Sequence, residues 1–534
     1  MKSSKLLLLS LLVAYFQVAP CMHAANAAAA TIPSYSVKAY GAKGDGKTVD
    51  TAAINAAIDA ASTAGGGTVY FPPGVFLSGS IRLKSNITMY LEAGSTIEAA
   101  SHTVTKFDEP EPNELATKFH YQDFGHSHWK NSLIWGIGLE NITIAGPGLI
   151  HGKGLDSGFN RFADESKGER RYHGNPEGSG NKAIALRDCR NVILRDFSIL
   201  QGGWFGILAT GVDNLTIDNL KIDTNRDGMD IDACQNVRVT NTSVNSPWDD
   251  GICLKASYGL GRIKHCDNIT ISDCYLSGNF DMGTLIDGTF KRSTPEYKSY
   301  QTGRIKLGTE SNGDFKNITI TNCVFDGSRG IAIESVDGSH IEDVAISNIT
   351  MRHVPNSPIF IRLGARLRGP EGTVVGSIRR ISVNNLVVSD ADWSLGNVIS
   401  GIPGHAVEDL RFSNIRMSFQ GGGSAALAKR IPPEEEKSYP EPSMFGSIPS
   451  YGFFFRHVRG IEMHDVKIDY VAPEVRPAIV LDDVQDAWFH HLNFERGSDN
   501  APVFDLRDIS DFSVTDSRGM ADLRLETGTK NRKH

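Results

Sequence analysis

A short motif recurs along most of this sequence and leaves few folds open to it. An asparagine is followed by three residues of which the first and third are apolar, with copies beginning at Asn86, Asn141, Asn191, Asn214, Asn236, Asn268 and Asn317. The copies at 191, 214 and 236 stand 23 and 22 residues apart. Strands repeated at this period bury their apolar side chains by stacking on the next repeat. We therefore predict an all-β chain, a single-stranded right-handed parallel β-helix, in which each asparagine turns the chain and stacks on its copy in the next coil.

The first 30 residues have the composition of a secretory signal. A basic head precedes an apolar run from Leu6 to Val18, and small residues follow it. The run is too short to span a bilayer, which indicates a cleaved signal rather than an anchor. We predict that residues 1–30 are removed and that residues 31–534 form one β-helix domain with no membrane attachment. The mature chain is then exported, to a periplasm or outside the cell.

One segment, residues 50–64, has the alanine and isoleucine spacing of an amphipathic helix. The open end of a β-helix exposes unpaired strand edges, and natural solenoids cover such ends. We predict that this short helix caps the N-terminal end.

Charge and cysteine content exclude several classes of function. The net charge is −8 and is spread evenly along the chain, which argues against nucleic acid as a partner. An anionic substrate would need locally placed cations. Of seven cysteines, one lies in the signal, and the others are expected as small buried side chains in the coils. No cysteine and histidine spacing indicates zinc, and we predict that the chain holds no metal and no cofactor. We also predict that it is a monomer.

Two aspartate-rich segments, residues 225–232 and 247–255, align at an offset of 23 residues. The alignment places Asp227 on Asp250, with Asp249 beside the pair. Parallel strands in neighbouring coils lie about 4.8 Å apart, so three carboxylates would crowd one spot and repel one another. Aspartate is also common in solenoid turns, but this clustering favours acid–base chemistry. Replacing any of the three by asparagine is expected to abolish catalysis and to relieve the repulsion.

Four long insertions interrupt the repeat, at residues 101–135, 152–180, 279–302 and 421–451. Insertions in a solenoid usually gather on one face and shape a binding cleft. Aromatic residues near them, Trp129, Trp204 and Phe205, are candidates for stacking on sugar rings, although packing is the commoner role for each one alone.

Several motifs, in this order and spacing, resemble glycoside hydrolase family 28, the polygalacturonases and rhamnogalacturonan hydrolases of pectin breakdown. They are residues 146–154 (GPGLIHGKG), the Asn225-x-Asp227-Gly228 segment, the Asp249–Asp250 pair, and residues 439–446 (YPEPSMFG). The likeness extends over nearly the whole mature chain. It implies a pectin-lyase-like β-helix and hydrolysis with inversion. It also implies that Asp249 is the general acid and that Asp227 and Asp250 are the base pair that activates water.

The sequence departs from the polygalacturonase pattern at two places. Where the family has Gly-His-Gly, this chain reads Thr302–Gly303–Arg304. Where the family has the Arg-Ile-Lys that grips a galacturonate carboxylate, it reads Ala332–Ile333–Glu334. The letters Arg-Ile-Lys do occur at residues 304–306, one coil early, and we interpret them as a coincidence of spelling. These departures argue against plain homogalacturonan as the substrate.

Four residues are predicted to bind substrate. Lys306 is expected to face the cleft and to supply positive charge locally, and Glu310 and Glu334 are expected to accept hydrogen bonds from sugar hydroxyls. Asn225 belongs to the aspartate motif itself. For each glutamate, closing a surface network is an equally good interpretation.

The function predicted is that of an exported inverting glycoside hydrolase acting on galacturonate-containing pectic poly- or oligosaccharides. An exo-galacturonidase or rhamnogalacturonan hydrolase fits better than a standard endo-polygalacturonase. One alternative is a pectic lyase, in which Asp227, Asp249 and Asp250 would hold calcium. The other is a non-catalytic β-helix, an adhesin or a glycan-binding scaffold, which explains the fold but not the three aspartates.

Overall fold

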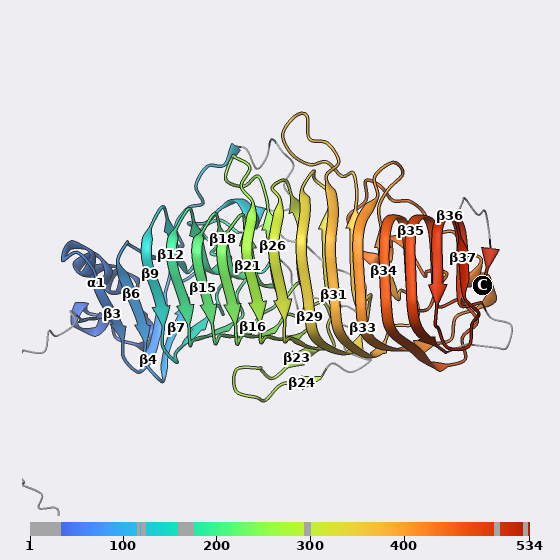
Figure 1. The fold of residues 1–534 in the computed structure, drawn as a ribbon. Coiled ribbons are helices and arrows are strands. Elements are labelled where there is room, and N and C mark those ends of the chain that lie inside the picture. Colours follow the sequence, from blue (N-terminus) through green and yellow to red (C-terminus); the bar gives the residue numbers. More distant parts are fainter. Residues whose placement is uncertain are drawn as a thin grey trace, which may run out of the picture.

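Parallel strands stack in register from one end of the molecule to the other (Figure 1). The computed structural model describes residues 34–114, 118, 124–158, 176–292, 301–495, 502–526 and 532–534. Within these residues the predicted parallel β-helix is confirmed. The predicted signal, residues 1–30, lies outside them. In the described part of the chain, no helix is both long and apolar enough to cross a membrane.

Each complete coil contributes one strand to each of three ladders, called here the first, second and third sheets. The first sheet contains β5 (Ile81–Arg82), β8 (Ile134–Ile137), β11 (Lys182–Arg187), β14 (Phe205–Thr210), β17 (Asp227–Asp232), β20 (Ile252–Ala256), β25 (Ile305–Ser311), β28 (Ile331–Ser335), β30 (Ile359–Leu363) and β32 (Asn397–Ser400). The second contains β1 (Ser34–Ser36), β3 (Gly67–Phe71), β6 (Ile87–Leu91), β9 (Glu140–Ala145), β12 (Arg190–Arg195), β15 (Asp213–Asp218), β18 (Gln235–Thr240), β21 (Cys266–Ser272) and β26 (Phe315–Thr321). The third contains β2 (Asp45–Val49), β4 (Gly74–Ser78), β7 (Ser95–Ala99), β10 (Leu149–His151), β13 (Ser198–Leu200), β16 (Lys221–Asp223), β19 (Ser243–Asn245), β22 (Tyr275–Ser277) and β27 (Val324–Asp326).

Later coils merge the second and third sheets into long strands. These are β29 (His340–Val354), β31 (Ser377–Ala391), β33 (Val407–Gly421), β34 (Phe453–Ala472), β35 (Ile479–Phe494) and β36 (Phe504–Thr515). The first residues of β34, β35 and β36 continue the first sheet. Two short strands, β37 (Leu523–Leu525) and β38 (Arg532–Lys533), pair antiparallel with β36 at the C-terminal end.

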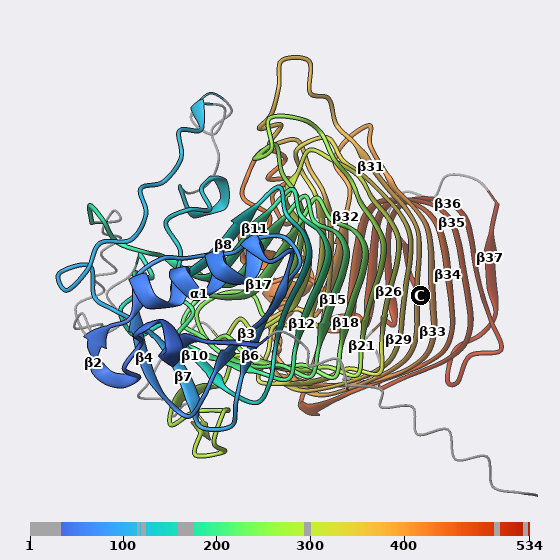
Figure 2. The same cartoon turned by 90° about the vertical axis from the view of Figure 1, so that its left-hand side faces the viewer.

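The helix α1 (Thr51–Thr63) covers the N-terminal end of the solenoid, as predicted (Figures 1 and 2). Ile54, Ala57, Ile58 and Ala61 are fully buried on its inner face. Asp50, just before the helix, accepts backbone N–H groups from Lys43 at 2.7 Å and Gly44 at 2.9 Å. The apolar stripe and this anchored entry loop together hold the cap on the strand edges.

The core is built from stacked apolar rows, because alternate residues of each strand point inward. In the first sheet, Ile207 pairs with Met229, Met229 with Ile252, and Ile252 with Ile305, and all are fully buried. Ile231 likewise pairs with Leu254. The register predicted from the two aspartate segments is therefore confirmed.

The recurring asparagines turn the chain and stack, also as predicted. Their φ angles lie between 53° and 62°, in the left-handed region that asparagine tolerates better than most residues. Asn141 donates its side-chain amide to Asn86 at 2.7 Å, Asn191 to Asn141 at 3.0 Å, and Asn214 to Asn191 at 2.9 Å. The six cysteines beyond residue 33 are free and buried, in accordance with their expected role as core side chains.

Two of the insertions reach opposite ends of the first-sheet strands. In 101–135, Asn113 donates to the carbonyl of Gly259, which follows β20. The insertion 279–302 contains the hairpin β23 (Phe280–Met282) and β24 (Lys291–Arg292), and Leu285 N–H donates to Asp223, which precedes β17. The hairpin projects below the solenoid in Figure 1. The insertions thus flank the outward face of the first sheet from both sides.

Candidate active site

Asp227 and Asp250 occupy equivalent positions of successive coils at one edge of the first sheet. Asp227 begins β17, and Asp250 stands two residues before β20. Gly228 N–H donates to the Asp250 carbonyl at 2.9 Å, and a Cβ on Gly228 would lie 2.4 Å from the carbonyl oxygen of Gly251. Only glycine permits this close approach of the two coils. Both aspartates are buried, and a carboxylate oxygen of each lies within 4.8 Å of the other.

Asp250 is held by two buried cations. Arg304 Nε lies 2.7 Å from Asp250 Oδ1, and Lys306 Nζ pairs with Oδ2. Burial alone would raise the pKa of Asp250, but Arg304 and Lys306 outweigh it and hold that pKa well below its usual range. Asp250 is therefore an ionised carboxylate.

Asp227 has the opposite character. Burial, and then the neighbouring charges of Asp249 and Asp230, raise the pKa of Asp227 well above its usual value. The expected crowding of carboxylates does raise one pKa, and it is that of Asp227. The two stacked carboxyl groups therefore have pKa values shifted in opposite directions.

Asp249 lies at the open side of the pair, with its side chain 30% exposed. Its Oδ2 accepts from Arg226 Nη2 at 3.2 Å, and the Arg226 guanidinium stacks 4.5 Å from the Trp204 ring. Trp204, like Trp129 and Phe205, is fully buried. These three aromatic side chains therefore pack inside the protein, which is the commoner role named for them above, and they are not placed to stack on a sugar ring.

Lys306 requires a correction. Its side chain is 3% exposed and its ammonium is bound to Asp250, so it does not face a cleft as a free cation. The Arg-Ile-Lys sequence at residues 304–306, interpreted above as a coincidence, has a role in this structure, because Arg304 and Lys306 both bind the Asp250 carboxylate. The register confirms that this segment lies one coil before Ala332 and Glu334, with Lys306 beside Ala332.

Glu310 also differs from its prediction. It is 2% exposed, and it pairs with Lys255 at 3.1 Å and with Arg368 at 3.2 Å. Burial raises the pKa of Glu310, but Lys255 leads a set of cations that hold it well below its usual range. Glu310 therefore closes a buried ion network, the alternative left open for it, and does not offer free acceptors to a sugar.

Sequence reasoning missed the other members of this network. Lys255 Nζ lies 3.2 Å from Asp230 Oδ2 and 2.6 Å from His126 Nε2, and His126 Nε2 lies 2.9 Å from the same Asp230 oxygen. Lys255 and Asp230 belong to the aligned aspartate segments, so their outward position could have been read from strand alternation. His126 comes from the 101–135 insertion, and no repeat indicates its position.

Glu334 is fully buried, and within the described residues neither of its carboxyl oxygens has a hydrogen-bond partner. Burial raises the pKa of Glu334 to about 8, even though Lys306 and Arg304 lower it. Glu334 is therefore not exposed for the predicted contact with a sugar hydroxyl. Asn225 is half-buried at the entrance to β17, two residues before Asp227, where contact with a substrate remains a prediction.

The insertion 421–451 brings two further residues to the aspartates. Glu441 accepts from Arg304 at 2.9 Å, from Arg329 at 3.1 Å and from Asn356 at 3.0 Å, three donors from three successive coils. Tyr439 is 42% exposed as a whole, but burial around its hydroxyl raises the pKa of Tyr439. The charged groups that act on this hydroxyl include Lys306, Glu334, Asp250 and Asp249.

A divalent metal fits this cluster poorly. Asp227, Asp250 and Cys253 place one donor atom each within 4.8 Å of one another. Calcium prefers six to eight oxygen ligands, and a thiol is a poor ligand for it. In addition, Arg304 and Lys306 already bind the two oxygens of Asp250.

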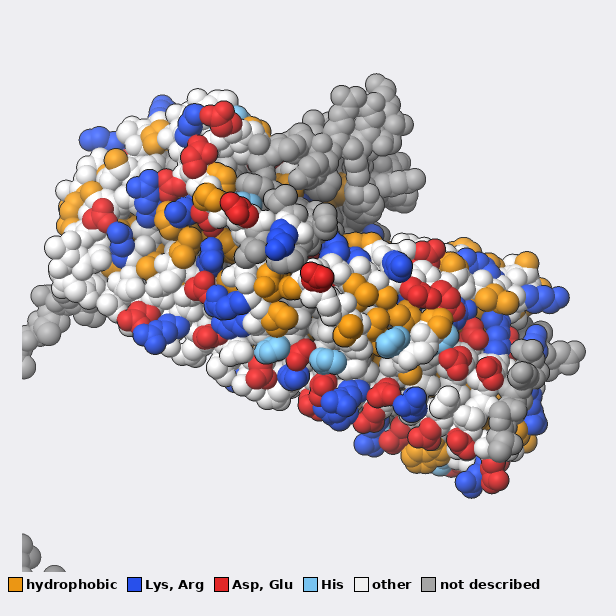
Figure 3. Space-filling model, turned by 90° about the horizontal axis from the view of Figure 1, so that it is seen from above, with side chains coloured by type: hydrophobic (Ala, Val, Ile, Leu, Met, Phe, Trp, Pro, Cys, Tyr) orange, Lys and Arg blue, Asp and Glu red, His pale blue; other side chains and the backbone are white. Residues whose placement is uncertain are grey.

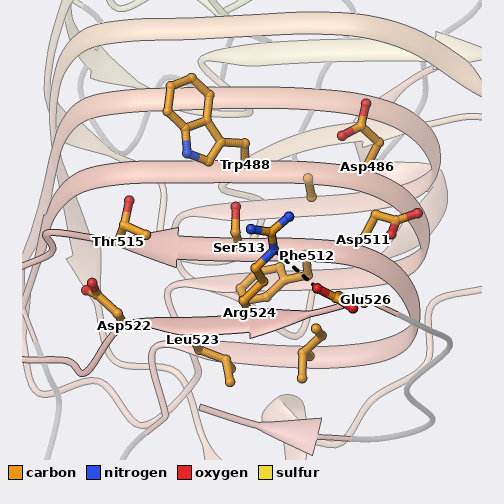
Figure 4. Close-up of a pocket in the computed structure, with 12 residues that line it drawn as sticks. Asp486, Trp488, Asp511, Phe512, Ser513, Thr515, Asp522, Leu523, Arg524 and Glu526 are labelled. Atoms are coloured by element: carbon orange, nitrogen blue, oxygen red, sulfur yellow. Dashed lines mark ion pairs between the residues drawn. The ribbon is translucent and has the colours of Figure 1, made fainter.

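Acidic and basic side chains are interspersed over the face in Figure 3. Near the C-terminal end, a groove of about 530 Å³ is lined by Trp488, Ser513 and Arg524 among others (Figure 4). Its ion pair, Arg524 with Glu526, is 3.9 Å long and both side chains are 80% exposed. This groove is solvated surface and lacks the buried, opposed charges of the aspartate cluster.

Fold and site together define a right-handed parallel β-helix protein with a buried carboxylate pair on its first sheet. In sequence, residues 34–145 match the family described as "Rhamnogalacturonase A/epimerase, pectate lyase-like", and residues 169–297 match "Right handed beta helix region". Both matches agree with the observed fold, and together with the relatives described next they bear out the resemblance to glycoside hydrolase family 28.

Three relatives illustrate the likeness. The chain is 26% identical over 432 residues to an exo-poly-α-D-galacturonosidase of Dickeya chrysanthemi, covering 72% of this chain and 67% of that one. It is 21% identical over 345 residues to an endo-polygalacturonase of Pectobacterium parmentieri, covering 61% and 80%. In structure it is similar to a family 28 exopolygalacturonase of Yersinia enterocolitica, with a TM-score of 0.56, 18% identity, and coverage of 91% and 79%.

Proposed function

We propose that this chain is an inverting glycoside hydrolase that cleaves glycosidic bonds in galacturonate-containing pectic glycans. The observation that carries the proposal is the stacked pair of Asp227 and Asp250, whose pKa values are shifted in opposite directions, with the more exposed Asp249 beside it. The names of the sequence relatives support the substrate class.

In the proposed mechanism, Asp249 protonates the oxygen of the leaving sugar, and Asp250 accepts the proton of the attacking water. Each carboxylate oxygen has two acceptor sites, so Asp250 can accept from water while it binds Arg304 and Lys306. Asp227, stacked beside Asp250, shares that water and orients it. Inversion requires an acid-to-base separation of about 6.5–9.5 Å, which leaves room for the water.

The experiment replaces Asp227, Asp249 and Asp250 by asparagine one at a time. Each change should lower kcat by about 10²- to 10⁴-fold, because general acid–base catalysis contributes that much per group. A substrate with an acidic aryl leaving group should partly rescue Asp249→Asn only, since that bond needs little protonation. Asp196→Asn, on another face and 42% exposed, serves as the control and should stay near wild-type activity. Equal rescue of all three variants, or a first product of retained configuration, would contradict the assigned roles.

A pectic lyase remains the second candidate, and its products would differ. A lyase leaves an unsaturated sugar with ultraviolet absorbance and commonly depends on calcium. We expect saturated products and activity unaffected by a chelator. Export after removal of residues 1–30, and a monomeric state, are parts of the same proposal.

A further inference from the structure

Glu334 lies within reach of the cations that hold Asp250. β28 pairs with β25 so that Lys306 neighbours Ala332, and Glu334 is two residues further along the same outward face. Lys306 and Arg304 are close enough for their charges to act on the Glu334 carboxyl group. The carboxyl group is fully buried without a hydrogen-bond partner in the described part of the chain. A buried group in this state costs free energy that neutralisation reduces.

The charged groups around Glu334 come from every element packed against it. Lys306 and Arg304 come from the β25 segment, Asp250 from the preceding coil, and Glu441 and Tyr439 from the 421–451 insertion. Arg362 of β30 is its neighbour in register on the other side. The Arg362 guanidinium, however, binds Ser400 at 2.8 Å and the carbonyls of Gly401, Glu434 and Glu435, so it does not neutralise Glu334.

Lys306 is the cation for which Glu334 would compete. Arg304 is already shared between Asp250 and Glu441. Lys306 pairs with Asp250 alone among the described carboxylates, so an ionised Glu334 would offer it a second partner on the next coil. A shift of about 1 Å in a catalytic group can cost about 10²-fold in rate.

On these grounds we propose that Glu334 is a positioning residue that acts through Lys306. While Glu334 is protonated, Lys306 stays on Asp250 and holds the base in place; when Glu334 ionises, Lys306 is drawn away and the base loses its orientation. The proposal rests on the proposed function, because it assigns Asp250 as the base. It gives this chain an alkaline limit to activity that is set by a residue outside the aspartate cluster.

The test uses the full mature chain and Glu334→Gln, which is isosteric and always neutral. In the wild type, kcat/KM should fall on the alkaline side with a midpoint near pH 8. In Glu334→Gln the fall with this midpoint should be lost, and any alkaline limb that remains should be that of the acid step itself, with activity at pH 6 within about twofold of wild type, because the neutral form of Glu334 is the working one. Glu434→Gln, on the insertion and 38% exposed, is the matched control and should keep the wild-type profile.

A second measurement needs no substrate. Because the folded-state pKa of Glu334 is raised, the folded state binds a proton that the unfolded state releases above about pH 4.5, so stability falls as pH rises from there to about 8. The folding equilibrium constant of Glu334→Gln relative to wild type should therefore grow about tenfold per pH unit across that window. Glu334→Met offers a second neutral variant if the amide folds poorly.

The outcomes separate the two proposals. An active enzyme whose alkaline limb is unchanged in both neutral variants, or a stability ratio that is flat with pH, overturns the role of Glu334. A wild-type chain that hydrolyses no pectic glycan at any pH overturns the proposed function instead.

Discussion

At the scale of single residues, Asp227 and Asp250 show how neighbours decide the state of identical side chains. Both are buried at equivalent coil positions, yet burial and two carboxylates raise the pKa of one, while Arg304 and Lys306 lower that of the other. From the sequence, replacing either by asparagine was expected to relieve repulsion. For Asp250 this expectation is wrong, because its charge is balanced by two buried cations.

The two asparagine variants should therefore have opposite effects on stability. Asp250→Asn leaves Lys306 without its carboxylate and Arg304 with Glu441 alone, and it should cost about 3–5 kcal/mol, the usual effect of breaking a buried ion pair. Asp227→Asn should stabilise at pH 7, because a carboxyl with a raised pKa lowers stability as pH rises above its unfolded value of about 3.9. Denaturant unfolding at pH 4 and pH 7 measures both effects. A stabilising Asp250→Asn would show that Arg304 and Lys306 do not depend on that charge.

At the scale of elements, the insertion 421–451 is a clamp between coils. It contains α3 (Ala425–Ala428) and the 3₁₀ turn η4 (Pro442–Phe445). Phe445 and Ile448 pack on an outward apolar row of the first sheet formed by Ala332, Phe360, Val398, Phe454 and Val480. The insertion covers this row, which explains why the first sheet carries apolar residues on its outer face. The same packing holds Glu441 against Arg304.

Loosening this clamp should lower activity without altering the aspartates. Phe445→Ala removes a fully buried ring and should cost about 3–5 kcal/mol in local stability. We expect kcat to fall by about 10²-fold, because Glu441 and Arg304 shift with the insertion. Limited proteolysis of the insertion and kcat are the two measurements. Ile431→Ala, at a residue 75% exposed on the same insertion, should change neither, and an unaffected kcat in Phe445→Ala would contradict the clamp.

At the scale of the whole molecule, the insertions decide how a polymer meets the aspartates. Segments from 101–135 and 279–302 attach at opposite ends of the first-sheet strands. Insertions on both sides of the aspartates favour a groove that is closed at one end. A polymer would then be cleaved from its own chain end. From the sequence, the insertions 101–135, 152–180 and 279–302 are expected to block one end of the groove. This blockage involves residues beyond those described, so it stays a prediction.

Exo action has a simple signature in solution. With a long galacturonate-containing polymer, reducing ends should accumulate while viscosity falls slowly, because each cut removes a short terminal unit. An endo-acting pectinase run in parallel gives the reference curve. A rapid loss of viscosity with few new ends would mean internal cleavage and would remove this prediction.

What the sequence determined by itself is the part of the protein set by local periodicity. The 22–23-residue repeat, the turning and stacking asparagines, the capping helix and the stacking of Asp227 on Asp250 all depend on one coil or on the next one. All were predicted, the helix over residues 50–64 where the structure has 51–63. Tertiary structure decided the electrostatics. Arg304 lies 54 residues beyond Asp250, and Glu441 lies 137 residues beyond Arg304, each across an insertion of irregular length. Because long insertions separate these residues in sequence, only the folded chain shows that the charges meet, and their meeting lowers the pKa of Asp250 while that of Asp227 is raised.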